Sequence, residues 1–238
     1  MLNKIFPCTC GLCGNLIDRG NLCPICYSEI KFIDESVVCK KCGIPLKSRS
    51  VDRSEFKPQD LCGECVLNQA QYKCARSLAS YDGALRHALH RYKYQGELRI
   101  GPLFSDLLFE HFPKVFDEFD IVIPVPMHLK RLREREFNHM VIIGESLTKK
   151  IGAVFDPYSL RKIKETKPQI EFKDRTGRRR NVKGAFGVPD NVKIVGKLVL
   201  LLDDVFTTGA TSDECVKTLL SSGVESVQVL TLMRTVSL

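Results

Sequence analysis

The residues best suited to chemistry lie in one short stretch, Lys197 to Thr211, which reads KLVLLLDDVFTTGAT. Two carboxylates, Asp203 and Asp204, are followed directly by a small-residue turn, Val205 to Thr211, which contains three hydroxyl-bearing threonines. Carboxylates suit the hydroxyl groups of a ribose or a hydrated Mg²⁺ ion. The N–H groups at the start of a helix carry partial positive charge and suit a phosphate. Together these groups predict a binding site for a phosphorylated sugar.

A strand and a helix must position these groups. Leu198 to Leu202 form an unbroken apolar run, which is typical of a strand buried on both faces in a parallel sheet. We expect this strand to stop at Asp203 and Asp204, and a helix to follow the turn and end near Gly223. Ligands of open α/β sheets bind at the carboxyl ends of the strands. The stretch therefore predicts an α/β fold with its site at that edge.

The cysteines divide the chain into two parts. Ten of the eleven precede residue 75, and eight of these form four C-x-x-C pairs: Cys10/Cys13, Cys23/Cys26, Cys39/Cys42 and Cys62/Cys65. Each pair can direct two thiolates at one ion, and two pairs complete a closed tetrahedral zinc site. The sequence predicts a module built on structural Zn²⁺ at residues 1–75. A larger domain is predicted at residues 76–238.

The sequence leaves the pairing of the four knuckles open. Sequential pairing joins the first pair to the second and the third to the fourth, as in a double zinc ribbon. Interleaved pairing, first with third and second with fourth, is the alternative. Cys8 and Cys74 remain unassigned. Cys215 lies on the apolar face of the predicted helix, which is typical of a core residue.

The net charge of +8 is concentrated in residues 161–183, which hold ten Lys or Arg against three Asp or Glu. Such a segment is typical of a polyanion-binding loop or of a solvated surface. The basic face of the helix predicted at residues 84–94, which includes Lys93, is expected to be solvated. No N-terminal run resembles a signal peptide, and no stretch reaches the ~18 apolar residues of a spanning helix. We therefore expect no membrane span and a cytoplasmic location, where cysteines stay reduced.

The stretch from Lys197 to Thr211 resembles the loop of type I phosphoribosyltransferases that binds phosphoribosyl pyrophosphate (PRPP). The whole chain resembles the ComF family, which joins a cysteine-rich zinc module to such a domain. The resemblance implies a mainly parallel sheet with flanking helices, preceded by a double zinc ribbon. It implies that Asp203 and Asp204 are catalytic residues that accept the ribose hydroxyls. The 5′-phosphate would be bound by Thr207, Thr208, Gly209, Ala210 and Thr211.

A second part of the resemblance follows the strand predicted at residues 119–125. Basic residues there precede an element that reads EFNH, residues 136–139. This element is similar to the Gly-Phe-Asn-Gln element of the ComF family, with Glu136 in place of Gly and His139 in place of Gln. The lost glycine is expected to change the turn. The resemblance implies Mg²⁺ as a cofactor and assigns pyrophosphate binding to Lys130, Arg131 and Arg135.

The basic segment at residues 161–183 is similar to the flexible loop that closes over the substrate in this family. The matching positions are Gln169, Arg175 and Asn181. A long loop inside a compact domain is usually functional or disordered.

The resemblance implies a role in DNA uptake during natural transformation, with the competence helicase or other DNA-uptake machinery as partners. Two hypotheses for the activity remain open. The first is a phosphoribosyltransferase that moves phosphoribose from PRPP to an unidentified acceptor. The second is a non-catalytic competence factor that binds single-stranded DNA and keeps the PRPP site as a sensor or relic.

Overall fold

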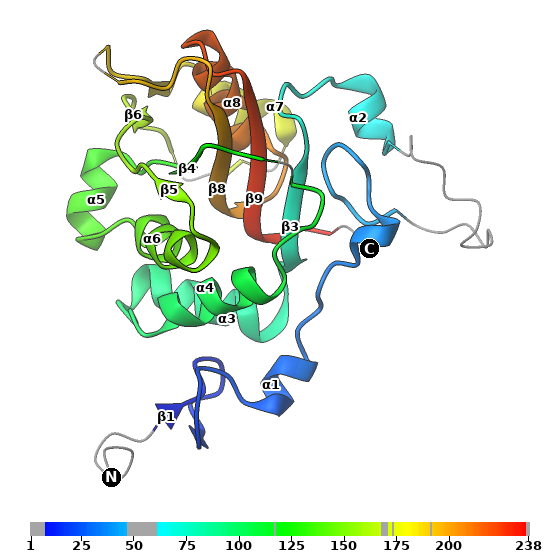
Figure 1. Cartoon of the computed structure of the whole chain (residues 1–238), viewed down its shortest axis with the longest axis vertical. Coiled ribbons are helices and arrows are strands. Elements are labelled where there is room, and N and C mark those ends of the chain that lie inside the picture. The colour runs from blue at the N-terminus through cyan, green and yellow to red at the C-terminus, as the bar shows by residue number, and fades with distance from the viewer. Residues whose placement is uncertain are drawn as a thin grey trace.

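The computed structural model describes residues 8–46, 61–116, 118–167, 171–172, 174–190 and 192–236. Its main element is a parallel five-stranded sheet with the strand order β3-β9-β8-β4-β5 (Figure 1). The strands are β3 (Ala75–Ser80), β4 (Ile121–Pro124), β5 (Val154–Phe155), β8 (Leu198–Phe206) and β9 (Ser226–Arg234). The predicted α/β class with a mainly parallel sheet is confirmed.

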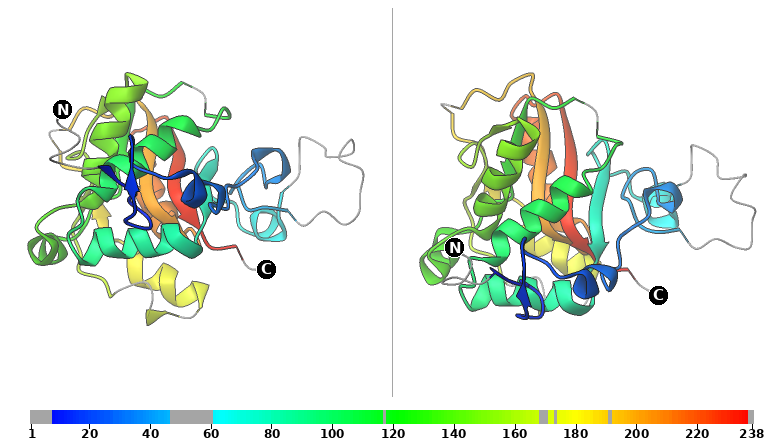
Figure 2. Two further views of the ribbon diagram at one scale, coloured as in Figure 1. Left: turned by 90° about the horizontal axis from the view of Figure 1, so that it is seen from below. Right: turned by 60° about the horizontal axis from the view of Figure 1, so that its bottom comes forward.

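The apolar run that opens β8 is buried on both faces, as predicted. Leu200 and Leu202 belong to the core on one face of the sheet, and Val199 and Leu201 belong to the core on the other. This division follows from the alternation of side chains along a strand. Figure 2 shows helices on both sides of the sheet. The first core contains α3 (Gly83–Tyr94), α4 (Ile100–Glu110) and α6 (His139–Ile151), and the second contains α8 (Ala210–Ser221).

The ends of the helices follow local sequence signals. Asn138 caps α6, because its side-chain oxygen accepts a hydrogen bond from the Met140 N–H at 3.0 Å. Gly152 ends the same helix with a φ of 69°. Gly223 follows α8 with a φ of 89°. Left-handed glycines of this kind are common after the last turn of a helix.

The N-terminal part contains little regular structure. Its elements are β1 (Cys8–Thr9), β2 (Leu16–Ile17), α1 (Pro24–Ser28), the short 3₁₀ helix η2 (Glu35–Val37) and α2 (Gly63–Leu67). Its first half packs directly on the larger domain, since Cys10, Leu12 and Cys26 share a core with Leu103 and Leu107 of α4. The polar stretch 47–58, which the sequence predicts as a loop, lies outside the described residues.

The structure differs from the sequence prediction in the length of β8. The strand continues through Asp203 and Asp204 to Phe206, because β9 keeps pairing with it as far as Arg234. The expectation that the strand stops at the acidic pair is therefore wrong. The turn begins at Thr207, two residues later than the expected start at Val205.

The basic segment also contains more regular structure than a loop. Helix α7 (Arg175–Val182) is capped by Asp174, which accepts a hydrogen bond from the Gly177 N–H at 2.5 Å. Strands β6 (Arg161–Lys162) and β7 (Phe186–Gly187) pair antiparallel, apart from the main sheet. Helix α5 (Leu129–Arg135) precedes α6. In the part of the chain that the structure describes, no helix has the length and apolar character that crossing a bilayer requires.

Candidate functional site

The turn after β8 begins a helix at the carboxyl edge of the sheet. Gly209 has a φ of 77° and is the N-cap of α8. The position has no room for a side chain, because an added Cβ would lie 2.8 Å from Cζ of Phe206. The Thr208 hydroxyl accepts a hydrogen bond from the Ala210 N–H at 3.4 Å. Since the first N–H groups of a helix have no partner within it, this turn suits an anion.

Asp203 and Asp204 point to opposite faces of the sheet. Adjacent side chains alternate along a strand, and both acids lie inside β8. Asp204 contacts side chains of α3 and α6 on one face. On the other face, the charge of Asp203 helps to raise the pKa of Cys215 in α8. The pleat of the strand, rather than the turn, therefore orients the two carboxylates.

Asp204 is bound by two side chains from neighbouring helices. Its Oδ2 lies 2.7 Å from Nζ of Lys93 in α3 and 2.6 Å from Nε2 of His139 in α6. The side chains of Lys93 and Asp204 are only 16% and 18% exposed. Burial acts to raise the pKa of Asp204, but Lys93 and His139 outweigh it and hold this pKa well below its usual range. Asp204 is therefore ionised at neutral pH.

The ring of His139 is neutral in this cluster. Burial lowers the pKa of His139, although its hydrogen bond with Asp204 acts in the opposite direction. The residue is only 4% exposed, so the loss of hydration of a charged imidazole outweighs one hydrogen bond. We assign the proton to Nε2, which then donates to Asp204. The positive charge beside Asp204 is that of Lys93.

Sequence reasoning did not identify Lys93 as a site residue. We expected a solvated side chain, and for Lys93 that expectation is wrong. A signal was present, because Lys93 continues the row of Leu85 and Leu89 at a spacing of four residues, which places it on the buried face of α3. A lysine on a buried face needs a partner of opposite charge. His139 gave no such signal, since its contact depends on how α6 packs against β8.

Asp203 carries a perturbed carboxyl group. Its Oδ1 accepts a hydrogen bond from the Asp204 N–H at 2.8 Å. Burial, and then the charge of Asp204, raise the pKa of Asp203 to about 7, while Lys93 and Lys162 act in the opposite direction. Burial also lowers the pKa of Lys162. A carboxyl group that titrates near neutral pH can hold or release a proton under physiological conditions.

The three residues predicted to hold pyrophosphate lie on α5, and each contacts another part of the chain. Lys130 and Arg131 bind the segment 165–166, through the Glu165 carboxylate at 2.9 Å and the Thr166 carbonyl at 3.3 Å. The Arg135 guanidinium lies 4.5 Å from the ring centre of Tyr94. The role of these three cations stays a prediction.

The turn after α5 keeps a left-handed backbone although glycine is absent. Among the described residues, Glu136 is the non-glycine residue with a positive φ, at 65°. A side chain in this conformation costs roughly 1 kcal/mol relative to glycine. Asn138 follows in place, where its Nδ2 donates to the Val125 carbonyl at 3.3 Å. The glutamate therefore strains this turn.

Asn181 ties α7 to the start of the basic segment. Its Oδ1 accepts a hydrogen bond from the Lys167 N–H at 3.1 Å, and its Nδ2 donates to the Lys167 carbonyl at 2.9 Å. Arg175 begins α7, but its side chain is not among the described parts of the structure, and Gln169 lies outside the described residues. The assignment of these residues to a substrate-closing loop stays a prediction.

The eight paired cysteines form two clusters in sequential order. Within each cluster all four sulfur atoms lie within 4.8 Å of one another. Tetrahedral zinc with Zn–S bonds of ~2.3 Å places sulfurs ~3.8 Å apart. The Cys13–Cys23 and Cys42–Cys62 sulfur distances are 3.9 and 3.7 Å. The sequential pairing is confirmed, with Cys10, Cys13, Cys23 and Cys26 in the first cluster and Cys39, Cys42, Cys62 and Cys65 in the second.

The donor groups of both clusters suit a structural zinc ion. Although burial opposes the shift, backbone N–H groups lower the pKa of Cys10 to about 6. The Cys42 thiol and backbone N–H groups lower the pKa of Cys39 to about 4. All eleven cysteines lie in the described residues, and there none of them forms a disulfide. Four protein sulfurs close the coordination sphere, so each cluster supports structure rather than catalysis.

Arginines of the larger domain hold both clusters. Arg91 Nη2 donates to the carbonyls of Gly11 and Leu12 in the first cluster, at 2.5 and 3.2 Å. Arg234 Nη1 donates to the Cys42 carbonyl in the second cluster at 2.5 Å. The zinc module is thereby attached to α3 on one side and to β9 on the other.

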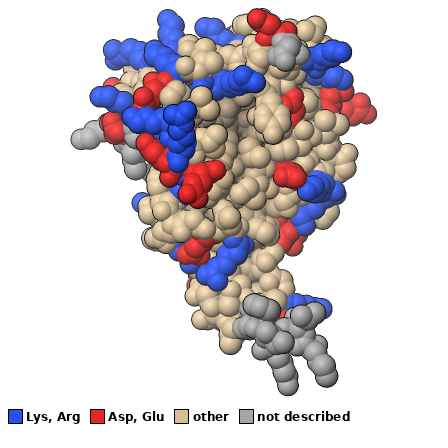
Figure 3. Space-filling model, turned by 90° about the vertical axis from the view of Figure 1, so that its left-hand side faces the viewer, with Lys and Arg blue, Asp and Glu red and all other residues tan. Residues whose placement is uncertain are grey.

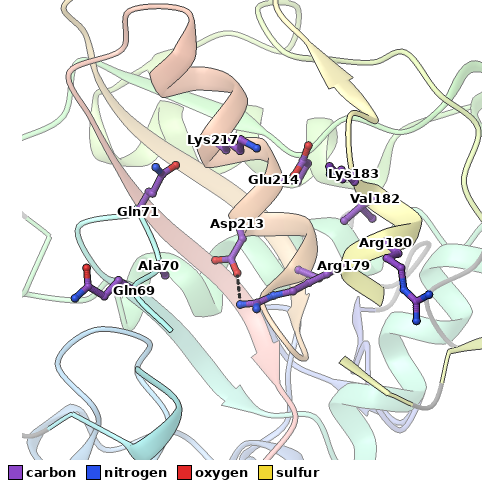
Figure 4. Close-up of a pocket in the computed structure, with 11 residues that line it drawn as sticks. Gln69, Ala70, Gln71, Arg179, Arg180, Val182, Lys183, Asp213, Glu214 and Lys217 are labelled. Carbon is purple, nitrogen blue, oxygen red and sulfur yellow. Dashed lines mark hydrogen bonds and ion pairs between the residues drawn. The ribbon is translucent and has the colours of Figure 1, made fainter. Parts of the chain in front are cut away.

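A pocket of about 320 Å³ lies beside the first turns of α8 (Figure 4). Its walls come from α7, α8 and residues 69–71. Arg179 crosses it, with Nη2 3.5 Å from Oδ2 of Asp213. Its charged residues are Arg179, Arg180, Lys183, Asp213, Glu214 and Lys217. Because both signs are present, the pocket suits a zwitterionic or polar ligand better than a polyanion.

The surface around α5 is also mixed in charge. Figure 3 shows Lys and Arg side chains gathered toward one end of this face, with Asp and Glu among them. The exposed pair Lys130–Glu165 is one such contact. Among the described residues, this face therefore carries both signs of charge rather than the continuous positive stripe that is typical of strong nucleic-acid binding.

Known proteins resemble both parts of the chain. A family model described as a double zinc ribbon domain matches residues 1–66. The DNA utilization protein YhgH of Salmonella typhimurium is 25% identical over 96% of this chain and 98% of its own length. Competence protein F of Haemophilus influenzae is 28% identical over 93% and 94%, and competence protein ComFC of Bacillus subtilis is 27% identical over 90% and 84%.

Solved structures that resemble the chain include two phosphoribosyltransferases. Adenine phosphoribosyltransferase from Thermoanaerobacter pseudethanolicus is 16% identical, with a TM-score of 0.36 over 59% of this chain and 83% of that one. Hypoxanthine phosphoribosyltransferase from Staphylococcus aureus is 16% identical, with a TM-score of 0.35 over 58% and 64%. The relatives in sequence do establish kinship: the chain is a homologue, along nearly its whole length, of the ComF-type proteins named for competence and DNA utilization, and it begins with a double zinc ribbon.

Proposed function

We propose that this chain binds PRPP at the turn between β8 and α8. The observation that supports this best is the Gly209 turn, which opens a twelve-residue helix directly after a strand that carries two acids. In this proposal the N–H groups and hydroxyls of Thr207–Thr211 bind the 5′-phosphate. Asp203 and Asp204 accept the ribose hydroxyls. The pyrophosphate is bound by Lys130, Arg131 and Arg135. To bind it, these side chains leave their contacts with the segment 165–166 and with Tyr94.

The contacts of Asp204 limit where Mg²⁺ can bind. Its Oδ2 already receives Lys93 Nζ and His139 Nε2. Mg²⁺ prefers oxygen ligands and keeps several waters, so the pyrophosphate and ribose oxygens of PRPP suit it better than this carboxylate. Bound there, Mg²⁺ would neutralise negative charge on the pyrophosphate.

A transferase reaction would use the same groups. Departure of pyrophosphate from the anomeric carbon leaves positive charge on the sugar, which the carboxylates of Asp203 and Asp204 would stabilise. The cations of α5 would stabilise the leaving group. In this proposal phosphoribose passes to an acceptor that supplies the attacking atom. Asp203 would take up the proton that the acceptor loses, since its pKa of about 7 suits proton transfer.

The proposed biological role follows from the relatives. Proteins named for competence and DNA utilization match the chain over nearly its whole length. We propose that this chain likewise acts in the uptake or use of DNA. The alternative activity is binding of single-stranded DNA without catalysis. The basic segment favours it, since Arg180 and Lys183 are exposed at the end of α7.

Isothermal titration calorimetry tests the PRPP proposal. Wild-type protein is titrated with PRPP in the presence of Mg²⁺, beside Thr208→Val in the turn and Lys149→Ala on α6. Lys149 is exposed and pairs with Glu145 on its own helix, so it serves as a control. For wild type and Lys149→Ala we expect heat of binding with a dissociation constant on the order of micromolar. For Thr208→Val we expect at least tenfold weaker binding, which corresponds to about the loss of one hydrogen bond to a charged group. Folded wild-type protein that shows no binding would refute the proposal.

The DNA alternative is tested by the salt dependence of binding. Fluorescence anisotropy with a labelled single strand is measured between low and physiological salt, for wild type, Arg180→Ala and Lys149→Ala. If phosphate contacts drive binding, affinity falls steeply with salt, and Arg180→Ala reduces both the affinity and the slope. A slope near zero, or equal binding by the two variants, argues against a DNA surface on α7.

A further inference from the structure

One buried arginine joins the second cysteine cluster to the turn after β8. Arg234 is the last residue of β9 and is 2% exposed. Its Nη1 donates to the carbonyl of Cys42, a member of the second cluster, at 2.5 Å. Its guanidinium also lies 5.1 Å from the ring centre of Phe206. Phe206 is the last residue of β8 and is the direct neighbour of Arg234 in the sheet.

The ring of Phe206 in turn sets the shape of the turn. It occupies the space beside Gly209, where a Cβ would lie 2.8 Å from its Cζ and 3.2 Å from its Cε1. The residue is 5% exposed, and the ring of Tyr72 meets it edge-on at 6.3 Å. The ring is therefore fixed between the guanidinium and the turn. A tilt of the ring toward Gly209 would therefore press on the turn at the start of α8.

The buried positive charge of Arg234 needs a negative partner, and the second cysteine cluster can supply one. Its guanidinium contacts a carbonyl and an aromatic ring, and no carboxylate of the described residues is seen to pair with it. Its Nε is buried without a hydrogen-bond partner. A buried cation requires an opposite charge nearby. Four thiolates around one zinc ion leave net negative charge, so the zinc-loaded second cluster supplies what Arg234 lacks.

The first cluster offers a matched contrast. Arg91 also donates to knuckle carbonyls, those of Gly11 and Leu12. However, Arg91 has a carboxylate partner in Glu97 at 3.6 Å, and its side chain is 26% exposed. It belongs to α3, on the face of the sheet away from α8. Of the two arginines, Arg234 is the one that contacts the residue shaping the turn.

We propose that Arg234 is a positioning residue that couples zinc in the second cluster to the shape of the turn at Thr207–Thr211. With zinc bound, the Cys42 knuckle supplies both the carbonyl and the negative charge that hold the guanidinium against Phe206. Without zinc the Cys42 knuckle is no longer held in place. The guanidinium of Arg234 then loses both the Cys42 carbonyl and the negative charge of the cluster. The turn then loosens, and a sugar phosphate binds there more weakly. The ligand part of this inference rests on the proposed function, whereas the zinc part does not.

Two variants of the full chain, Arg234→Met and Arg91→Met, test the coupling without any ligand. Zinc release to a chromogenic chelator is timed, and alkylation followed by mass spectrometry shows which cysteines are freed. Amide hydrogen exchange is measured at residues 205–211 and over the rest of the sheet. For Arg234→Met we expect about tenfold faster release from the second cluster and about tenfold faster exchange confined to the turn. For Arg91→Met we expect faster release from the first cluster and wild-type exchange at the turn.

The ligand measurement uses PRPP with Mg²⁺ as the probe. We expect about tenfold weaker binding by Arg234→Met and wild-type binding by Arg91→Met. If wild-type protein does not bind PRPP, the proposed function fails, and hydrogen exchange alone decides the coupling. Arg234→Lys keeps the charge but loses the planar group, so it should retain zinc better than Arg234→Met. If Arg234→Met does not fold, Arg234→Lys replaces it in all of these measurements. Wild-type exchange at the turn in the Arg234 variants, or equally fast exchange in Arg91→Met, would overturn the inference.

Discussion

The buried ion pair between Lys93 and Asp204 should stabilise the fold far more than a surface pair. Nζ and Oδ2 lie 2.7 Å apart, and both side chains are more than four-fifths shielded from solvent. Lys93→Met keeps the length of the side chain but leaves the Asp204 carboxylate with the neutral ring of His139 as its remaining partner. Removing one member of a buried pair costs about 3–5 kcal/mol. Because His139 remains and some solvent reaches the pair, we expect about 2–3 kcal/mol.

A double-mutant cycle separates the pair from the packing of each side chain. Urea unfolding with zinc present gives the free energy of unfolding for Lys93→Met, Asp204→Asn and the double variant. We expect the double variant to lose about 2 kcal/mol less than the sum of the single losses. The exposed pair Lys31–Asp82, with side chains 69% and 56% exposed, is the control and should show a coupling near zero.

The pH dependence of this coupling has a definite sign. The pKa of Asp204 is lowered from its ordinary value of 3.8, so its contribution to stability is complete above about pH 4. As the pH falls below that value, the unfolded chain binds a proton first, and the stabilisation is lost. The cost of Lys93→Met should therefore shrink in acid. A coupling no larger than that of the surface pair at neutral pH would refute the assignment of a buried ion pair.

Three further predictions follow from strain, titration and metal binding. Glu136→Gly should raise the free energy of unfolding by roughly 1 kcal/mol in urea titration, because it relieves a left-handed backbone; a loss would show that the glutamate side chain is needed. The pKa of Asp203 is raised to about 7, so the folded state keeps a proton that the unfolded chain releases above about pH 4, and this stabilisation is lost as the pH rises through 7. Asp203→Asn should therefore lose less stability than wild type between pH 5.5 and 8.5, by about 2 kcal/mol, and equal pH profiles would contradict the shift. Metal analysis should find two zinc ions per chain, and Cys13→Ser or Cys62→Ser should each remove one of them; loss of both ions from either variant would argue against two independent sites.

The cluster at Asp204 changes the interpretation of the acidic pair. From the sequence the two acids appear equivalent, both ready to accept ribose hydroxyls. In the structure Asp204 is ionised and held by Lys93 and His139, whereas Asp203 titrates near neutral pH. A ribose that binds Asp204 must either share this carboxylate with Lys93 or displace Lys93 from it. The two acids are therefore expected to contribute unequally to ligand binding.

Local signals in the sequence were sufficient for much of the fold. The apolar run at Leu198–Leu202 identifies a central strand, and Gly223 marks a helix end at a position the structure confirms. The four C-x-x-C pairs identify the eight cysteines that form the two clusters. These features are predictable because strand alternation, helix caps and knuckle spacing each depend on residues a few positions apart.

Other features were decided by packing between distant segments. β8 continues past the acidic pair because β9 remains beside it, and the sequential pairing of the cysteines depends on the path of the chain between knuckles. His139 and Asp204 are 65 residues apart, and Arg234 reaches Cys42 across 192 residues. A sequence shows which residues carry charge and which favour burial, but not which distant charges meet. Tertiary structure alone decided that one acid is bound by a lysine and that an arginine connects a zinc cluster to the turn, because burial forces each of these charges to find its partner wherever the fold places one.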